Sequence, residues 1–268
     1  MDRNDSALGY ILSGCIFYVF GLKWCYEYAK YWHSHRDLDH EREPTKLVRA
    51  SRNCQKLLRR HPLEGTLKLL ATAMGLASTL TGNLPNSVET APSPKVVHAT
   101  IYLFFALSGL VDVLTFYFPH VVSDGLAKMA LAQAFFIEGF LFLWTSQSNN
   151  SAIVLARIVW TSSFAVVLEL VWPEMKLLRA ASTLLHGSWL AHMVRTRVEC
   201  NFATLAECNL ESLKIETLAL SFSWHFAASF IVTLCVVAVT RSCAPKLRPD
   251  DPPEIPIYDY CHDVDQRV

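Results

Sequence analysis

The hydrophobic residues of this chain form long, almost continuous runs that are separated by short polar segments. The two clearest runs are VVHATIYLFFALSGLVDVLTFYF at residues 96–118 and LAKMALAQAFFIEGFLFLW at residues 126–144. A helix needs about 20 consecutive apolar residues to cross the hydrocarbon core of a bilayer, and both runs reach that length. The pattern therefore predicts helices that span a membrane.

Seven runs of this kind follow one another, and no strand-like alternation of comparable length lies between them. The predicted spans are residues 8–24, 63–80, 96–118, 125–144, 152–172, 175–194 and 215–240. The expected fold class is all-α: a polytopic membrane protein built as a seven-transmembrane helix bundle with a polar interior. Residues 1–243 would form the transmembrane domain. Residues 244–268, rich in Pro and Asp, are expected to be a disordered cytosolic tail.

Positively charged residues are distributed unevenly about these spans. With the residues at the span ends included, the first, third and fifth loops and the tail hold 17 Lys and Arg. The N-terminus and the other loops hold 5. Loops rich in Lys and Arg remain in the cytosol. We therefore expect the N-terminus on the lumenal or extracellular side of an endomembrane or the plasma membrane, and the C-terminus in the cytosol.

This orientation assigns candidate modification sites to the lumenal side. Asn4 and Asn149 begin N-x-S/T sequons there and are candidate glycosylation sites. Cys200 and Cys208 lie in the last lumenal loop and are a candidate disulfide, because an oxidising compartment allows such bonds to persist.

Composition narrows the class of partner. The chain is 52% hydrophobic and 18% charged, with 24 Lys and Arg against 24 Asp and Glu. This balance gives no global basic charge of the kind that points to nucleic acid, so the predicted partner is the lipid bilayer. Unknown protein partners would bind the 25–62 loop and the C-terminal tail. The eight Cys show no CxxC pair and no zinc-finger spacing. Cys25 and Cys243, at the cytosolic edge, are candidate palmitoylation sites.

Ionisable and hydroxyl side chains interrupt the apolar runs. A carboxylate at bilayer depth costs several kcal/mol unless a partner stabilises it, so such residues indicate a polar interior. The candidate polar cluster consists of Asp112, Glu138, His186, His225, Ser108, His98 and Glu169. At about 1.5 Å of rise per residue, the first four lie deep enough to converge if their helices are neighbours. Each acid is either a structural carboxyl that joins helices or a participant in binding, conduction or catalysis.

Spacing along the helices suggests partners for these acids. Glu64 and Lys68 are four residues apart, where they can pair on one helix face. Ser108 lies one turn from Asp112 and can satisfy it in the same way. The partners expected for Asp112 and Glu138 are His186, His225, Ser108 and Trp N–H groups, and those expected for Glu169 are Arg157 or Lys176.

The segments HATIYLFFALSGLVDVLTF and FFIEGFLF resemble the transmembrane protein 45 family, whose relatives include the transmembrane epididymal proteins. The similarity extends to GCIFYVFGLKW, LLHGSW and SFSWHFAASFIV, and so covers most of residues 8–240 in the same order. The resemblance implies a multi-pass membrane protein without a defined biochemical activity. Thr145 stands where the family tends to have His, and His186 where it tends to have Gln. Both exchanges count against a fixed metal site.

Three classes of function remain open. The first and favoured one is a membrane scaffold or trafficking factor, for which the polar residues are architecture. The second is a proton or small-solute transporter or channel that uses a His/Asp/Glu ladder across the bilayer. The third is an intramembrane metal-dependent hydrolase with His and Asp ligands, although the chain lacks an HExxH motif. An enzyme is thus the less favoured class. No cofactor is predicted, and Zn would be needed only by the hydrolase.

Overall fold

The computed structural model describes residues 3–36, 62–80, 94–145, 150–202 and 215–243. These residues form seven α-helices and contain no strand. The helices are α1 Arg3–Arg36, α3 Leu63–Leu80, α4 Pro94–Tyr117, α5 Asp124–Thr145, α6 Asn150–Leu168, α7 Met175–Phe202 and α9 Ile215–Cys243. Each helix falls on one of the predicted apolar runs, and the all-α fold class is confirmed.

Three helices end four or more residues away from the predicted span ends. α1 has 34 residues and continues past the predicted end at Trp24. α7 has 28 residues and continues past Val194. α6 ends earlier than predicted, at Leu168. Residues 169–171 form turns instead, and Trp172, directly before Pro173, is itself disfavoured in the helical conformation.

Four of the seven helices are long and apolar enough to cross a membrane. They cover Lys95–Tyr117, Asp124–Thr145, Asn150–Leu168 and Ile215–Ser242. The described parts of α1, α3 and α7 are not among them, and each carries an ionisable residue within its apolar run: Lys23, Lys68 and Arg179. The described helices thus contain four candidate spans, fewer than the seven that the sequence predicts.

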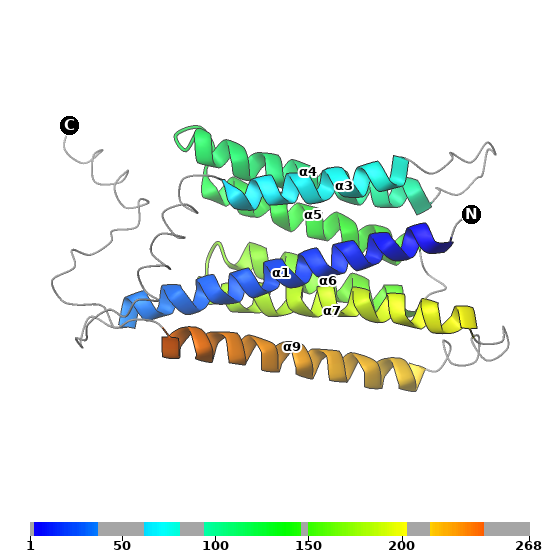
Figure 1. The fold of residues 1–268 in the computed structure, drawn as a ribbon. Helices are drawn as coiled ribbons and strands as arrows, with labels where there is room; N and C mark the ends of the chain where they lie inside the picture. Colours follow the sequence, from blue (N-terminus) through cyan, green and yellow to red (C-terminus); the bar gives the residue numbers. More distant parts are fainter. Residues whose placement is uncertain (1–2, 37–61, 81–93, 146–149, 203–214, 244–268) are drawn as a thin grey trace, which may run out of the picture.

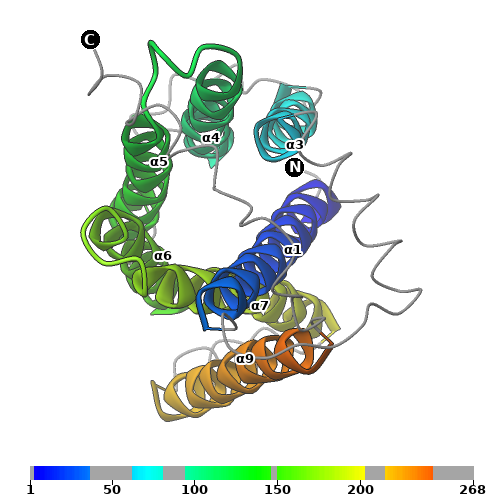
Figure 2. The same cartoon turned by 90° about the vertical axis from the view of Figure 1, so that its left-hand side faces the viewer.

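The helices run side by side along one common direction, and consecutive helices point in opposite directions (Figure 1). Seen end-on, six of them form a closed ring in which each contacts the next, in the order α1, α3, α4, α5, α6, α7 and back to α1 (Figure 2). α9 lies outside this ring and packs against α1 and α7. The alternating directions bring all the helix ends that are predicted to be cytosolic to one end of the bundle.

Three phenylalanine side chains meet in the middle of the ring. Phe17 of α1, Phe105 of α4 and Phe135 of α5 contact one another, with ring centroids 5.3 to 6.0 Å apart. Aromatic rings in protein cores prefer offset or edge-to-face contacts at about these distances. We call this group the phenylalanine layer. It places apolar packing between the two ends of the ring interior.

Glycine residues allow the closest contacts between helices of the ring. A Cβ atom on Gly187 would lie 2.6 Å from the carbonyl oxygen of Gly14, so the backbones of α7 and α1 touch there. A Cβ atom on Gly65 would lie 2.8 Å from the carbonyl oxygen of Gly109, so α3 and α4 touch as well. Small residues at helix contacts are typical of membrane proteins, in which close backbone packing drives association.

Large apolar side chains cover the outer face of α9. Trp224, Phe230 and Ile231 are all more than half exposed. Water-soluble proteins rarely expose contiguous apolar surface of this kind. Together with the four apolar helices, this surface indicates a membrane-embedded protein in a lipid environment.

Candidate functional site

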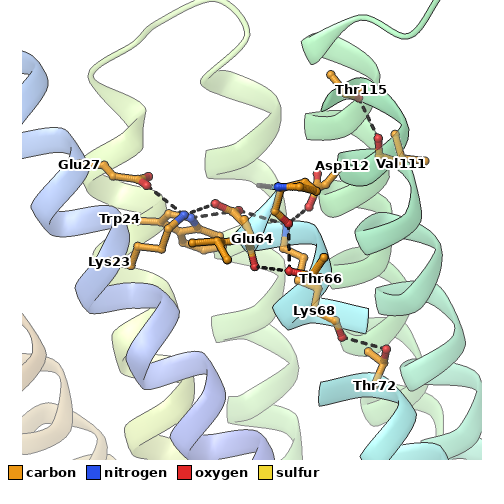
Figure 3. A network of polar contacts seen from close by, with 12 residues as sticks. Lys23, Trp24, Glu27, Glu64, Thr66, Lys68, Thr72, Val111, Asp112 and Thr115 are labelled. Atoms are coloured by element: carbon orange, nitrogen blue, oxygen red, sulfur yellow. Dashed lines mark hydrogen bonds and ion pairs between the residues drawn. The ribbon is translucent and has the colours of Figure 1, made fainter. Parts of the chain in front are cut away.

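Charged side chains gather near the end of the ring that is predicted to be cytosolic (Figure 3). Lys68 of α3 is central to them. Its Nζ donates to Asp112 Oδ2 of α4 at 2.6 Å and lies 3.2 Å from Glu64 Oε1. The Lys68 side chain is only 6% exposed and that of Asp112 17% exposed. The lysine thus forms a buried link between α3 and α4.

Glu64 joins Lys68 to α1. Its carboxylate accepts a hydrogen bond from Lys23 Nζ and a second one from Trp24 Nε1 at 3.3 Å. Lys23 also lies 2.9 Å from Glu27 Oε1, one turn along α1. Glu64 therefore connects three side chains from two helices (Figure 3).

Arg179 of α7 continues these contacts around the ring. Its guanidinium lies over the Trp24 ring, 4.3 Å from the centroid, in a cation–π arrangement. Its Nη1 is also 2.8 Å from Glu169 Oε2, directly after α6. The other oxygen of Glu169 lies 3.3 Å from Lys128 Nζ of α5. The Glu169 side chain is 1% exposed and depends on these two cations.

We call this set of contacting residues the charged belt. Its members are Lys23, Trp24, Glu27, Glu64, Lys68, Asp112, Lys128, Glu169 and Arg179. Its four acids balance its four bases. The belt joins α1, α3, α4, α5, α7 and the turn after α6 at one level of the ring.

Burial makes the charged belt sensitive to the loss of any one partner. A complete buried ion pair adds little stability, because the desolvation penalty offsets much of the attraction. Removing one partner instead leaves an uncompensated buried charge and costs about 3–5 kcal/mol. Lys68 and Glu169 are the members for which this argument is strongest, since both side chains are almost fully buried.

A second polar contact lies elsewhere in the ring interior. His186 Nε2 of α7 is 3.4 Å from Glu138 Oε1 of α5, and both side chains are buried. The Phe17 ring stacks on the imidazole with centroids 4.1 Å apart, and Phe135 packs against its edge at 6.3 Å. A carboxyl and an imidazole at this distance can share a proton, since each is able to donate or accept according to its protonation.

The two polar sites lie on opposite sides of the phenylalanine layer. α4 and α5 are antiparallel, and Phe105 contacts Phe135. Asp112 lies seven residues beyond Phe105 toward the charged belt, whereas Glu138 lies three residues beyond Phe135 toward the other end. At 1.5 Å per residue, the two acids are about 15 Å apart along the bundle.

A third group of polar side chains lies between α9 and the ring. The imidazole of His225 packs against the imidazole of His192 and the indole of Trp189, with ring centroids 5.1 and 5.7 Å apart. Two turns further along α9, Thr233 accepts a hydrogen bond from the Cys25 thiol of α1 at 3.9 Å. These contacts orient a polar face of α9 toward α1 and α7.

The structure contains some of the predicted contacts and not others. Glu64 lies next to Lys68, and Glu138 next to His186, as the sequence suggests. Asp112, however, has Lys68 as its partner instead of a histidine. The four deep residues Asp112, Glu138, His186 and His225 occupy three separate places instead of one, because their helices do not share a single contact point.

The remaining candidate residues have other roles. Ser108 is buried, but its hydroxyl finds no hydrogen-bond partner in the described part of the chain, so it does not hold Asp112. His98 packs edge-on against Tyr10 and Phe142, with centroids 5.3 and 6.2 Å away, and thereby links α4 to α1 and α5.

Five members of the charged belt are not among the candidates from the sequence: Lys23, Trp24, Glu27, Lys128 and Arg179. Glu169 was expected to pair with Arg157 or Lys176. Its ion pairs are with Lys128 of α5 and Arg179 of α7, and Lys176, which also lies on α7, interacts with it electrostatically. A signal for these residues does exist in the sequence. Each lies at or near the end of a predicted span on the predicted cytosolic side, at about the same depth as the residues it contacts.

Most of the predicted modification sites cannot be placed. Asn149 and Cys208 lie outside the described residues, and the side chains of Asn4, Cys200 and Cys243 do too. The 25–62 loop and the C-terminal tail, the expected partner-binding segments, also lie mainly outside them. Cys25 is described and its thiol is fully buried, which leaves it no access for palmitoylation in this arrangement.

No metal-ligand set forms in the described residues: nowhere among them do three His, Cys, Asp or Glu side chains gather as a metal site requires. The hydrolase alternative therefore finds no candidate ligands there. No protein-family model matches the sequence. The resemblance to the transmembrane protein 45 family accordingly stays a prediction.

Proposed function

We propose that this protein is a seven-span integral membrane protein that acts as a scaffold or trafficking factor. The observation that carries the proposal is the charged belt. Its ion pairs form two groups that the Arg179–Trp24 contact connects, and together they join six segments of the ring near the end predicted to be cytosolic. A network of this kind fixes the positions of the helices and neutralises its own charges, which suits a structural role.

We include α1, α3 and α7 among the spans because their charges face other protein groups. Lys68 and Arg179 are buried and paired, and Lys23 contacts two acids. Charged residues within spans commonly face the bundle interior and pair with one another. Apolarity alone therefore underestimates the number of spans in a bundle with a charged belt.

Epitope tags at the two chain ends test this number, because seven is odd. We expect antibodies to reach a C-terminal tag once the plasma membrane is permeabilised. An N-terminal tag should react only when the lumenal side is opened, or from outside for protein at the cell surface. An even number of spans, such as four, would leave both tags on the same side. Finding them there would contradict the seven-span arrangement.

A proton or small-solute transporter or channel is the second candidate function. The buried Glu138–His186 pair is the observation that favours it. A ladder across the bilayer would also have to include Asp112 and Glu169. These two acids are held by cations of the charged belt, and the phenylalanine layer lies between Asp112 and Glu138. The described contacts thus favour the scaffold over the ladder.

Proton flux distinguishes the two functions. We expect purified protein in liposomes, under an imposed pH gradient, to leak protons no faster than protein-free liposomes, with an ionophore as the positive control. The Glu138→Gln variant serves as the matched control, because glutamine keeps the shape of the side chain but cannot carry its charge. A proton flux in the unmodified protein that disappears in this variant would support the transporter and contradict the scaffold proposal.

A further inference from the structure

Among the buried polar atoms that have no hydrogen-bond partner within the described chain, three belong to one pair of contacting side chains in the ring interior. They are Glu138 Oε2 and both imidazole nitrogens of His186. The two side chains are 4% and 0% exposed. His186 Nε2 faces Glu138 Oε1 at 3.4 Å, which is longer than the roughly 2.7–2.9 Å of a charge-assisted hydrogen bond.

Leaving these atoms unpaired is unfavourable. A buried donor or acceptor without a partner costs about 1–3 kcal/mol, and buried polar atoms nearly always have a protein or water partner. A neutral imidazole has one donor and one acceptor, and a carboxyl group has two oxygens. Whichever group holds a shared proton, one carboxyl oxygen and one ring nitrogen still need partners.

Aromatic side chains contact the imidazole of the Glu138–His186 pair. Phe17 stacks on the imidazole, and Phe135 contacts its edge. Tyr102 of α4, whose hydroxyl lies 3.3 Å from Ser13 Oγ of α1, is near enough to interact electrostatically with Glu138.

We propose that this level of the ring interior is a binding site for at least one water molecule. The water donates to Glu138 Oε2 and bonds to the remaining ring nitrogen of His186. Water is the smallest molecule that both donates and accepts, and buried waters make about three hydrogen bonds each. The close stacking of Phe17 on the imidazole favours a guest of this size. The inference goes beyond the scaffold function and does not depend on it.

Radiolytic hydroxyl labelling with mass spectrometry tests this site. X-rays generate hydroxyl radicals from bound as well as bulk water, so side chains beside a buried water are oxidised although they are not exposed. We expect His186 and Phe135 to be labelled in the purified full chain, with Phe135 labelled several-fold faster than Phe20. Phe20 is a comparable control because it is also a buried phenylalanine of the ring, 4% exposed.

Two variants test whether the labelling depends on the polar groups of Glu138 and His186. Glu138→Gln keeps an oxygen acceptor and should retain the labelling of Phe135. The double variant Glu138→Leu with His186→Leu removes both polar groups, and Phe135 labelling should fall to the rate of Phe20. Equal, low labelling of Phe135 and Phe20 in the unmodified protein, with exposed Tyr26 beyond the first predicted span fully reactive, would overturn the proposal. This comparison decides the question even if the double variant does not fold.

Discussion

Lys68→Met is expected to destabilise the folded protein by about 3–5 kcal/mol, the usual effect of removing one partner from a buried ion pair. Methionine keeps much of the length of the side chain but removes the cation between Asp112 and Glu64. Glu64 retains Lys23 as a partner. Asp112 has no other ion pair among the described residues, so its largely buried carboxylate is left uncompensated.

Thermal unfolding of the purified protein in detergent measures this effect. Leu70→Met is the matched control, because it introduces the same side chain two residues along α3, at an exposed position. The double variant Lys68→Met with Asp112→Leu should regain most of the lost stability, since replacing a whole buried pair by apolar residues is often nearly neutral. If Lys68→Met unfolds at the same temperature as Leu70→Met, the charged belt does not hold the ring together.

The helices and their approximate positions follow from the sequence, because the length of an apolar run is a local property. The Glu64–Lys68 contact follows for the same reason, as it joins residues one helical turn apart. The residues at which helices end are harder to predict from the sequence. α1 continues beyond Trp24 as a polar helix, and a polar helix has no apolar run to mark its end.

The partners of Asp112 do not follow from the sequence, because they depend on which helices are neighbours. Spacing along the helix suggests Ser108 as the partner of Asp112, and similar depth in the predicted spans suggests the histidines. In the ring, α3 lies between α1 and α4, so a lysine of α3 reaches Asp112 first. The Glu138–His186 contact could be predicted because the sequence places both residues near the middle of their predicted spans.

Gly187→Ala is expected to destabilise the fold by about 1–3 kcal/mol, as overpacking typically does. A Cβ atom there would lie 2.6 Å from Gly14 O and 2.7 Å from Tyr18 N, both backbone atoms of α1. Backbone atoms cannot rotate away as a side chain can. α1 and α7 must therefore move apart, and theirs is the most extensive contact between described helices. Gly187→Leu is expected to prevent the ring from closing.

Two other glycines provide a graded comparison for the same unfolding measurement. At Gly14 the added Cβ would lie 3.1 Å from Gly187 O, so a smaller loss of stability is expected. At Gly125 its nearest neighbour would be Ser123 Oγ at 3.8 Å, an ordinary contact, so Gly125→Ala should leave stability unchanged. The unfolding temperature should therefore fall most for Gly187→Ala and less for Gly14→Ala. If Gly187→Ala is as stable as Gly125→Ala, α1 and α7 do not touch along their backbones, and the ring is not closed at this seam.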